Sequence, residues 1–106
     1  MSANQNKVAL VTGASRGIGA SIAERLAKDG FTVVINYAGN AALAEELAQK
    51  IEKAGGKALT AQGDVADAEA VRRMFDAAET AFGGVDVLVN NAGIMLLSRL
   101  ADVDDA

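Results

Sequence analysis

The sequence predicts an α/β fold in which a parallel β-sheet lies between two layers of helices. Two observations predict it: short apolar segments recur at nearly even spacing, and amphipathic helical patterns fill the intervals. The segments begin 24, 26 and 28 residues apart, enough for a strand, a helix and two turns each. Right-handed crossovers between such strands give a three-layer sandwich. The predicted strands are Lys7–Thr12, Phe31–Asn36, Lys57–Gln62 and Val85–Asn90.

Each interval between the strands carries apolar residues at helical spacing, and we expect these stripes to pack in the core. They comprise Ile18, Ile22 and Leu26, then Leu43, Leu47 and Ile51, then Val71, Met74, Phe75, Ala78 and Phe82. Asn40 and Asp67 are the expected N-caps of the second and third helices. Glycines follow each helical pattern, as is typical of helix C-termini. These are Gly30, Gly55-Gly56 and Gly83-Gly84.

Composition excludes several classes of function. The 106 residues are expected to form a single domain, and a net charge of −4 without a basic run argues against nucleic acid as a partner. No cysteine or histidine is present, and the carboxylates show no metal-binding spacing, so we expect no metal site. No apolar segment is long enough for a membrane span or a signal peptide, which favours a cytoplasmic location without a membrane partner.

A glycine-rich turn joins the first strand to the first helix. Gly13, Gly17 and Gly19 lie directly after Val8–Val11, where backbone N–H groups and a helix N-terminus can approach an anion. A turn that merely reverses the chain is the alternative. The sequence is not a phosphate loop of the GxxxxGK[ST] type, because Ile18 stands where its second glycine belongs. The turn therefore predicts a nucleotide-binding site.

Three sequence motifs together resemble those of the short-chain dehydrogenase/reductase family. The residues around them are similar to those of its 3-oxoacyl-carrier-protein-reductase-like members. They are Thr12-Gly13-x-x-x-Gly17-Ile18-Gly19, Asp64-Val65 and Asn90-Asn91-Ala92-Gly93. The resemblance implies a Rossmann-type sheet of four strands in the order 3-2-1-4, truncated relative to about seven in the family. Residues 1–106 would form a partial dinucleotide-binding domain.

The resemblance also implies which residues hold the cofactor. The glycine turn would carry the pyrophosphate and the ribose, Asp64 and Val65 would border the adenine, and Asn90 would line the other side. The full expected set is Gly13, Ser15, Arg16, Gly17, Ile18, Gly19, Asn36, Tyr37, Asp64, Val65, Asn90, Ala92 and Gly93. Two alternatives stay open. Asp64 can simply form an Asx turn, and Asn90-Asn91 can be buried amides that tie loops to the first strand through Thr12.

We expect NADP(H) rather than NAD(H) as the cofactor. Relatives that prefer NAD usually carry an acidic residue at the end of the second strand, whereas this chain has Asn36-Tyr37-Ala38 there. No carboxylate would repel a 2′-phosphate, and Arg16 in the turn can pair with it. Arg16 as a solvated surface charge is the alternative.

Family chemistry would be hydride transfer between nicotinamide and a ketone or secondary alcohol, which requires a Ser and a Tyr-x-x-x-Lys pair. Tyr37 is the only tyrosine, Ala41 stands four residues later, and Ser98 has no histidine to activate it. We expect Tyr37 in the second strand–helix loop, covering the adenine end. No catalytic residue is therefore assigned, and the 106 residues alone are expected to be inactive.

Two other functions fit parts of the sequence. A stand-alone nucleotide-binding or self-associating module without turnover stays open. A receiver-like signalling domain would need acidic residues where Thr12 and Gly13 stand, so we set it aside although Asp64 follows the third strand as that fold requires.

The fourth predicted strand would be an apolar edge. We expect it to pair with another copy of the chain, as a homo-oligomer, or with a complementing half. The segment Ile94–Ala106, apolar at its start and acidic at its end, could supply a fourth helix over this face.

Overall fold

The computed structural model describes residues 7–14 and 17–91. Strands and helices alternate along this part of the chain as predicted, with bounds shifted by one or two residues. The elements are β1 (Val8–Val11), α1 (Gly17–Lys28), β2 (Thr32–Tyr37), α2 (Ala41–Lys53), β3 (Ala58–Gln62), α3 (Ala68–Phe82) and β4 (Val87–Val89).

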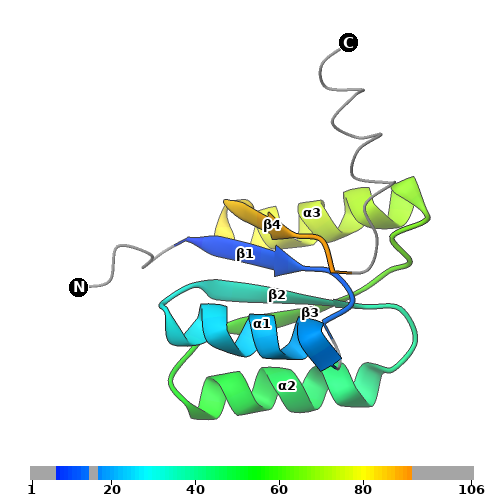
Figure 1. Ribbon diagram of the computed structural model, residues 1–106. Helices are drawn as coiled ribbons and strands as arrows, with labels where there is room; N and C mark the ends of the chain where they lie inside the picture. Colours follow the sequence, from blue (N-terminus) through cyan, green and yellow to red (C-terminus); the bar gives the residue numbers. More distant parts are fainter. Residues whose placement is uncertain (1–6, 15–16, 92–106) are drawn as a thin grey trace.

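The four strands form one parallel sheet in the order β3-β2-β1-β4, which confirms the predicted Rossmann-type topology. The register places Leu10 between Val34 on β2 and Leu88 on β4. Helices α1 and α2 cover one face and α3 covers the other, so the sheet is the middle of three layers (Figure 1). The chain reverses its direction across the sheet between β1 and β4, where open α/β sheets bind ligands outside the carboxyl ends of their strands.

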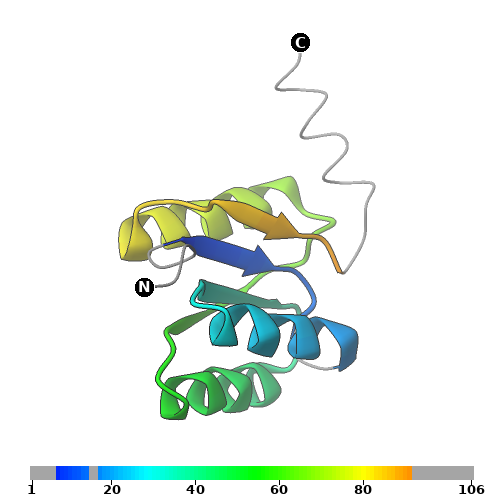
Figure 2. The same ribbon diagram turned by 60° about the vertical axis from the view of Figure 1, so that its left-hand side comes forward.

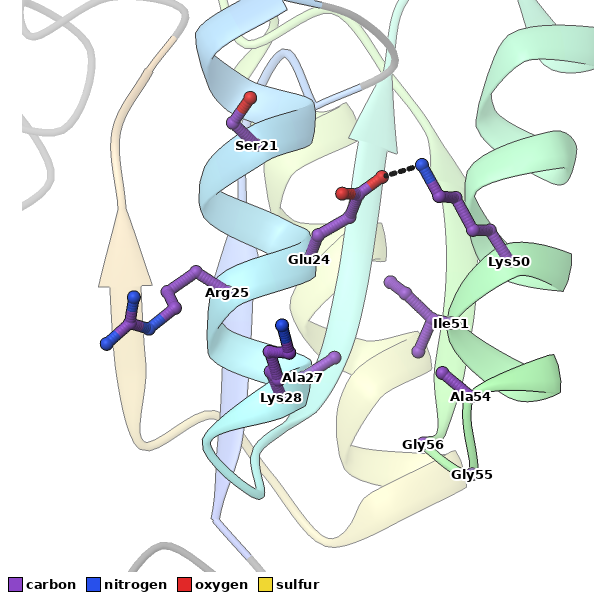
Figure 3. A pocket seen from close by; sticks show the side chains of 10 residues that line it. All are labelled: Ser21, Glu24, Arg25, Ala27, Lys28, Lys50, Ile51, Ala54, Gly55 and Gly56. Atoms are coloured by element: carbon purple, nitrogen blue, oxygen red, sulfur yellow. Dashed lines mark ion pairs between the residues drawn. The ribbon is translucent and has the colours of Figure 1, made fainter.

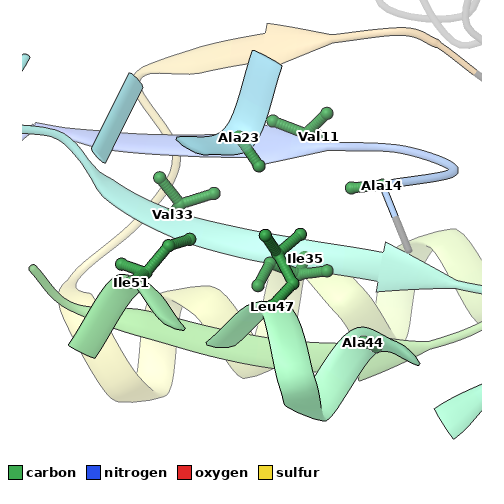
Figure 4. Close-up of a cluster of buried hydrophobic side chains, with 8 residues drawn as sticks. All are labelled: Val11, Ala14, Ala23, Val33, Ile35, Ala44, Leu47 and Ile51. Carbon is green, nitrogen blue, oxygen red and sulfur yellow. The ribbon is translucent and has the colours of Figure 1, made fainter. Parts of the chain in front are cut away.

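Both faces of the central strands are buried, because helices cover the sheet on both sides. Side chains alternate along each strand and separate the core into two clusters. The cluster beneath α1 and α2 (Figure 4) comprises Val11, Ala14, Ala23, Val33, Ile35, Ala44, Leu47 and Ile51. The cluster beneath α3 comprises Val8, Leu10, Val34, Ala61, Val71, Met74 and Ala78.

The predicted apolar stripe of α3 is confirmed. That of α2 is confirmed at Leu47 and Ile51, but Ala44 rather than the half-buried Leu43 completes it in the core. The stripe of α1 is wrong at its first member. The Ile18 side chain is 74% exposed, whereas Ala23 is fully buried. Gly19 faces the end of β1, and a helix turns by about 100° per residue, so Ile18 points outward. Ile22 and Leu26 pack half-buried against the core as predicted.

Helix ends follow the predicted capping residues. Asn40 Oδ1 accepts a hydrogen bond from the Leu43 N–H at 3.2 Å, and Asp67 Oδ1 accepts one from the Glu69 N–H at 3.0 Å. Gly83 ends α3 in the left-handed region with φ of 91°, and its N–H donates to Glu79 O at 2.8 Å. These contacts satisfy backbone groups that would otherwise lack partners.

Strand β4 lies at one edge of the sheet, beside β1 (Figure 2). Leu88 is 37% exposed although Leu10, its neighbour on β1, is fully buried. Asp86 fixes the start of this strand: its Oδ2 accepts the Val8 N–H at 2.8 Å, and its own N–H donates to Val8 O at 2.8 Å. Among the described residues the predicted apolar edge is confirmed. The predicted helix within Ile94–Ala106 lies outside them.

Candidate functional site

The buried Thr12 side chain joins the carboxyl ends of β1 and β4. The Asn91 backbone N–H donates to Thr12 Oγ1 at 2.9 Å, and the Thr12 hydroxyl donates to Asn90 Oδ1 at 3.2 Å. The backbone contributes as well, because the Thr12 N–H donates to Val89 O at 3.0 Å. The expected tie through Thr12 is confirmed. Asn90 is half-buried and Asn91 is exposed, however, whereas the alternative described them as buried amides, because they lie past the end of an edge strand.

Both backbone polar groups of Gly13 are held by asparagine side chains. Its N–H donates to Asn36 Oδ1 at 3.0 Å, and its carbonyl oxygen accepts from Asn91 Nδ2 at 3.1 Å. The residue adopts φ of 60°, a left-handed conformation that favours glycine. The neighbouring Ala14 N–H donates to Asn36 O at 2.8 Å. Since the Gly13 N–H already has a partner, donors toward an anion would come from later residues of the turn.

The first turn of α1 lies close against the end of β1, and only glycine permits this approach at Gly19. A Cβ there would collide with Gly13 O and stand 2.6 Å from Asn91 Nδ2. Gly17, by contrast, faces open space and has φ of 65°. The N-terminal N–H groups of α1 therefore lie beside the open space at Gly17, which fits a phosphate group.

Asn36 lies at the centre of the carboxyl edge but is only 2% exposed. Its Nδ2 donates to Gly63 O at 3.0 Å and to Ala61 O at 3.2 Å, and lies 2.8 Å from Met74 Sδ. The side chain therefore points into the layer beneath α3. The structure places this predicted site residue behind Gly13, where it acts on the turn from within the protein.

Tyr37 is the last residue of β2, so its predicted place in the following loop is wrong. Pairing of Tyr37 with Gln62 extends the ladder between β2 and β3 by one residue. The Gly63 N–H then donates to Tyr37 O at 2.9 Å, which carries the connection past the end of β3. The side chain is half-buried against the core beneath α1 and α2.

Asp64 and Val65 follow β3 at the same edge of the sheet. Asp64 Oδ1 accepts a hydrogen bond from the Ala66 N–H at 2.9 Å, which confirms the Asx turn given as the alternative. Val65 is half-buried against the core beneath α3. The carboxyl group of Asp64 is exposed, and contact of this pair with adenine stays a prediction.

The remaining predicted site residues fall into two groups. Ile18 presents an exposed apolar side chain beside Gly17 and is accessible to a ligand. Four residues lie outside the described part of the chain: Ser15, Arg16, Ala92 and Gly93.

The sequence reasoning missed Gly63. Its carbonyl accepts from Asn36, and a Cβ on it would lie 3.2 Å from the Ala70 Cβ, so α3 approaches the end of β3 closely. The sequence could have indicated this residue, because Gly63 stands directly between the third strand and Asp64.

Two surface hollows flank α1. One, of about 650 Å³, lies between α1 and α2, where Glu24 and Lys50 form an ion pair at 3.0 Å (Figure 3). It is lined by the later parts of both helices, and these run back toward the amino ends of the strands. A second hollow, of about 590 Å³, follows α1 from Gly17 to Leu26 and begins at the glycine turn. Open α/β sheets bind ligands outside the carboxyl ends of their strands, where the glycine turn lies. This favours the turn, rather than the larger hollow, as the binding site.

Within the described ranges, no group of three or more carboxylates is placed to hold a metal ion. No helix among the same residues is long and apolar enough to cross a membrane.

Comparison with protein families gives a match over residues 7–106 to the family described as short chain dehydrogenase. The chain belongs to the short-chain dehydrogenase family. This match covers every element of the fold and all three motifs that carried the resemblance.

Similar proteins include an uncharacterized oxidoreductase of Methylorubrum extorquens, 49% identical over 99% of this chain and 42% of its own length. The 3-oxoacyl-(acyl-carrier-protein) reductase of Staphylococcus epidermidis is 51% identical over 92% of this chain and 41% of its own length. The chain thus spans about two fifths of the length of the curated relatives it matches.

Solved structures of short-chain dehydrogenases share the fold. The enzyme from Burkholderia cenocepacia, solved in complex with NADP, is 54% identical with a TM-score of 0.80, over 86% of this chain and 37% of that one. A dehydrogenase/reductase from Sinorhizobium meliloti is 47% identical with a TM-score of 0.81, over 85% of this chain and 36% of that one.

Proposed function

We propose that the chain is the cofactor-binding part of an NADP(H)-dependent short-chain oxidoreductase. When bound, the nicotinamide would supply hydride exchange with a ketone or secondary alcohol. The observation that carries the proposal is the contact between Gly13 and Gly19. Because Gly19 has no side chain, the start of α1 can approach the end of β1 closely. This turn is followed by the helix N-terminus that a pyrophosphate requires.

Several residues would hold the dinucleotide. Gly17, Ile18 and Gly19 offer the N-terminal N–H groups of α1, and Asn90 stands across the switch point between β1 and β4. Asp64 and Val65, at the end of β3, are suited to border the adenine. Thr12, through its bonds to Asn90 and Asn91, keeps the two sides of the site at a fixed separation.

The choice of NADP(H) rests on charge. The sequence Asn36-Tyr37-Ala38 at the end of β2 contains no carboxylate to repel a 2′-phosphate, and Arg16 in the turn supplies a positive charge for it. The Burkholderia relative, 54% identical, was solved with NADP. Together these support NADP(H) over NAD(H).

Fluorescence titration with NADPH and NADH tests the proposal. We expect the chain to bind NADPH at least about tenfold more tightly than NADH, and Arg16→Ala to remove most of that difference. Lys28→Ala, which removes one positive charge near the far end of α1, is the matched control and should leave both affinities unchanged. Equal binding of the two nucleotides, or an Arg16→Ala variant that binds like the control, would refute the NADP(H) preference.

Turnover requires residues that the 106 positions do not contain. The only tyrosine, Tyr37, is followed four positions later by Ala41, so no Tyr-x-x-x-Lys pair is present. The chain by itself should therefore bind NADPH without oxidising it in the presence of ketones. NADPH consumption above the buffer rate, measured at 340 nm, would contradict this.

The edge strand β4 supports a second candidate function. The exposed β4 edge and Leu88 favour association, which also suits a non-catalytic nucleotide-binding module that self-associates. Pairing of β4 with another copy, or with a complementing half of an oxidoreductase, is part of the proposal. A catalytic Tyr-x-x-x-Lys segment in the same gene would decide for the oxidoreductase.

A further inference from the structure

We propose that Asn36 is a positioning residue that sets the separation between the glycine turn after β1 and the loop after β3. It would thereby control dinucleotide affinity without touching the dinucleotide. The inference rests on the proposed function, since it concerns the geometry of the same site.

One amide group spans three neighbouring strand ends. Asn36 extends from the end of β2; its Oδ1 accepts the Gly13 N–H at 3.0 Å, and its Nδ2 donates to Gly63 O at 3.0 Å. A further bond reaches Ala61 O at 3.2 Å on β3. Gly13 continues the network to β4 through Asn91 Nδ2. All four strands are therefore linked at their carboxyl ends through this side chain and Gly13.

Only an amide satisfies this arrangement. The Oδ1 side faces a donor, Gly13 N–H, while the Nδ2 side faces two carbonyl oxygens and the Met74 sulfur. The network fixes the amide orientation, because the reverse orientation would place donor against donor and acceptor against acceptor. A carboxylate would lack the donor, and an alkyl side chain would lack both groups.

The position of the network predicts an effect on dinucleotide binding. It joins the glycine turn, which would hold the pyrophosphate, to the segment from Gly63 to Val65, which would border the adenine. A rigid dinucleotide contact at both places requires the two loops to keep one separation. With only 2% of its surface exposed, Asn36 offers no face to a ligand and can act only through its partners.

Asn36→Ala and Val34→Ala separate positioning from general loss of packing. Val34 is fully buried on the same face of β2, two residues earlier, but lies in the apolar cluster beneath α3. In the full 106-residue chain, Asn36→Ala should weaken NADPH binding about tenfold relative to Val34→Ala, the loss expected for one buried hydrogen-bond network. It should also speed hydrogen exchange of the Gly13 amide about tenfold relative to Val34→Ala.

Equal NADPH affinity and equal Gly13 exchange in the two variants would overturn the proposal. If Asn36→Ala does not fold, hydrogen exchange of the Gly13 amide in the unmodified chain decides. Protection from exchange supports the hydrogen bond between Gly13 and Asn36, and exchange at the free-peptide rate overturns the proposal. If the unmodified chain binds no NADPH, the proposed function fails. The exchange data then still determine whether Asn36 positions the turn.

Discussion

The Asn91 backbone N–H donates to the Thr12 hydroxyl oxygen at 2.9 Å, across 79 positions of sequence. This bond attaches the segment after the edge strand β4 to the first residue after β1. Asn91 adds a second bond from its side chain to Gly13 O at 3.1 Å. The short strand β4 is thus fixed at its carboxyl end by side chains, as Asp86 fixes it at the start.

Replacing Thr12 tests this attachment. Thr12→Val keeps the shape of the side chain but removes both hydrogen-bonding functions, so the free energy of unfolding should fall by about 1–2 kcal/mol. Thr12→Ser keeps the hydroxyl and should lose less than half as much. Urea unfolding followed by circular dichroism measures both. A Thr12→Val variant as stable as the unmodified chain would show that the bonds contribute nothing.

Gly19→Ala should abolish measurable NADPH binding while Gly39→Ala leaves it intact. A Cβ at Gly19 meets the backbone carbonyl of Gly13 and the Asn91 amide, and neither can move without breaking their mutual bond. At Gly39 a Cβ meets nothing within 4 Å, so the same change serves as the matched control.

The measurements for these two variants are NADPH titration and thermal unfolding. Gly19→Ala should lower the free energy of unfolding by about 1–3 kcal/mol, as overpacking does. Gly17→Ala should cost only about 1 kcal/mol, because the space is open and only its φ of 65° is strained. A Gly19→Ala variant that binds NADPH like Gly39→Ala would contradict the close approach.

The sequence predicted the order of the elements well because hydrophobic periodicity and glycine positions are local signals. It also predicted the Thr12 tie to Asn90 and Asn91, since the ends of adjacent parallel strands must meet. What it missed depends on the direction of side chains at the strand ends. Whether Asn36 faces a ligand or the interior follows from the register of β2, and one residue of shift reverses it.

The exposure of Ile18 shows the same limit. Its spacing to Ile22 and Leu26 fits a buried stripe, but the contact between Gly19 and Gly13 decides how α1 is rotated. That contact is tertiary and leaves no periodic signal. The helical pattern therefore predicted the existence of α1 but not which residues of its first turn face the core.

Acidic substitutions at adjacent positions of β2 should affect different properties, stability at Asn36 and nucleotide preference at Tyr37. Asn36→Asp would place a buried carboxylate oxygen against Gly63 O and Ala61 O, so the free energy of unfolding should fall by about 3 kcal/mol or more. Tyr37→Asp introduces its charge at a half-buried position at the strand end. It should mainly weaken NADPH binding relative to NADH, by repulsion of the 2′-phosphate.

Urea unfolding and titration with both nucleotides distinguish these outcomes. Tyr37→Asn, which changes size and polarity without adding charge, is the control for the lost packing of Tyr37. If Tyr37→Asp and Tyr37→Asn change the ratio of NADPH to NADH affinity equally, charge at this position does not select the cofactor.

The β4 edge should make the 106-residue chain associate with itself. Among the described residues β4 has a neighbouring strand on one side only. Such an edge, with an exposed Leu88, is a template for pairing, and a charge on it opposes pairing. Leu88→Lys should therefore shift the chain toward monomer in sedimentation velocity runs at increasing concentration. Thr60→Lys on β3, the opposite edge strand, should leave association unchanged. A chain that stays monomeric at the highest concentration, or associates equally in both variants, would show that β4 is not the contact.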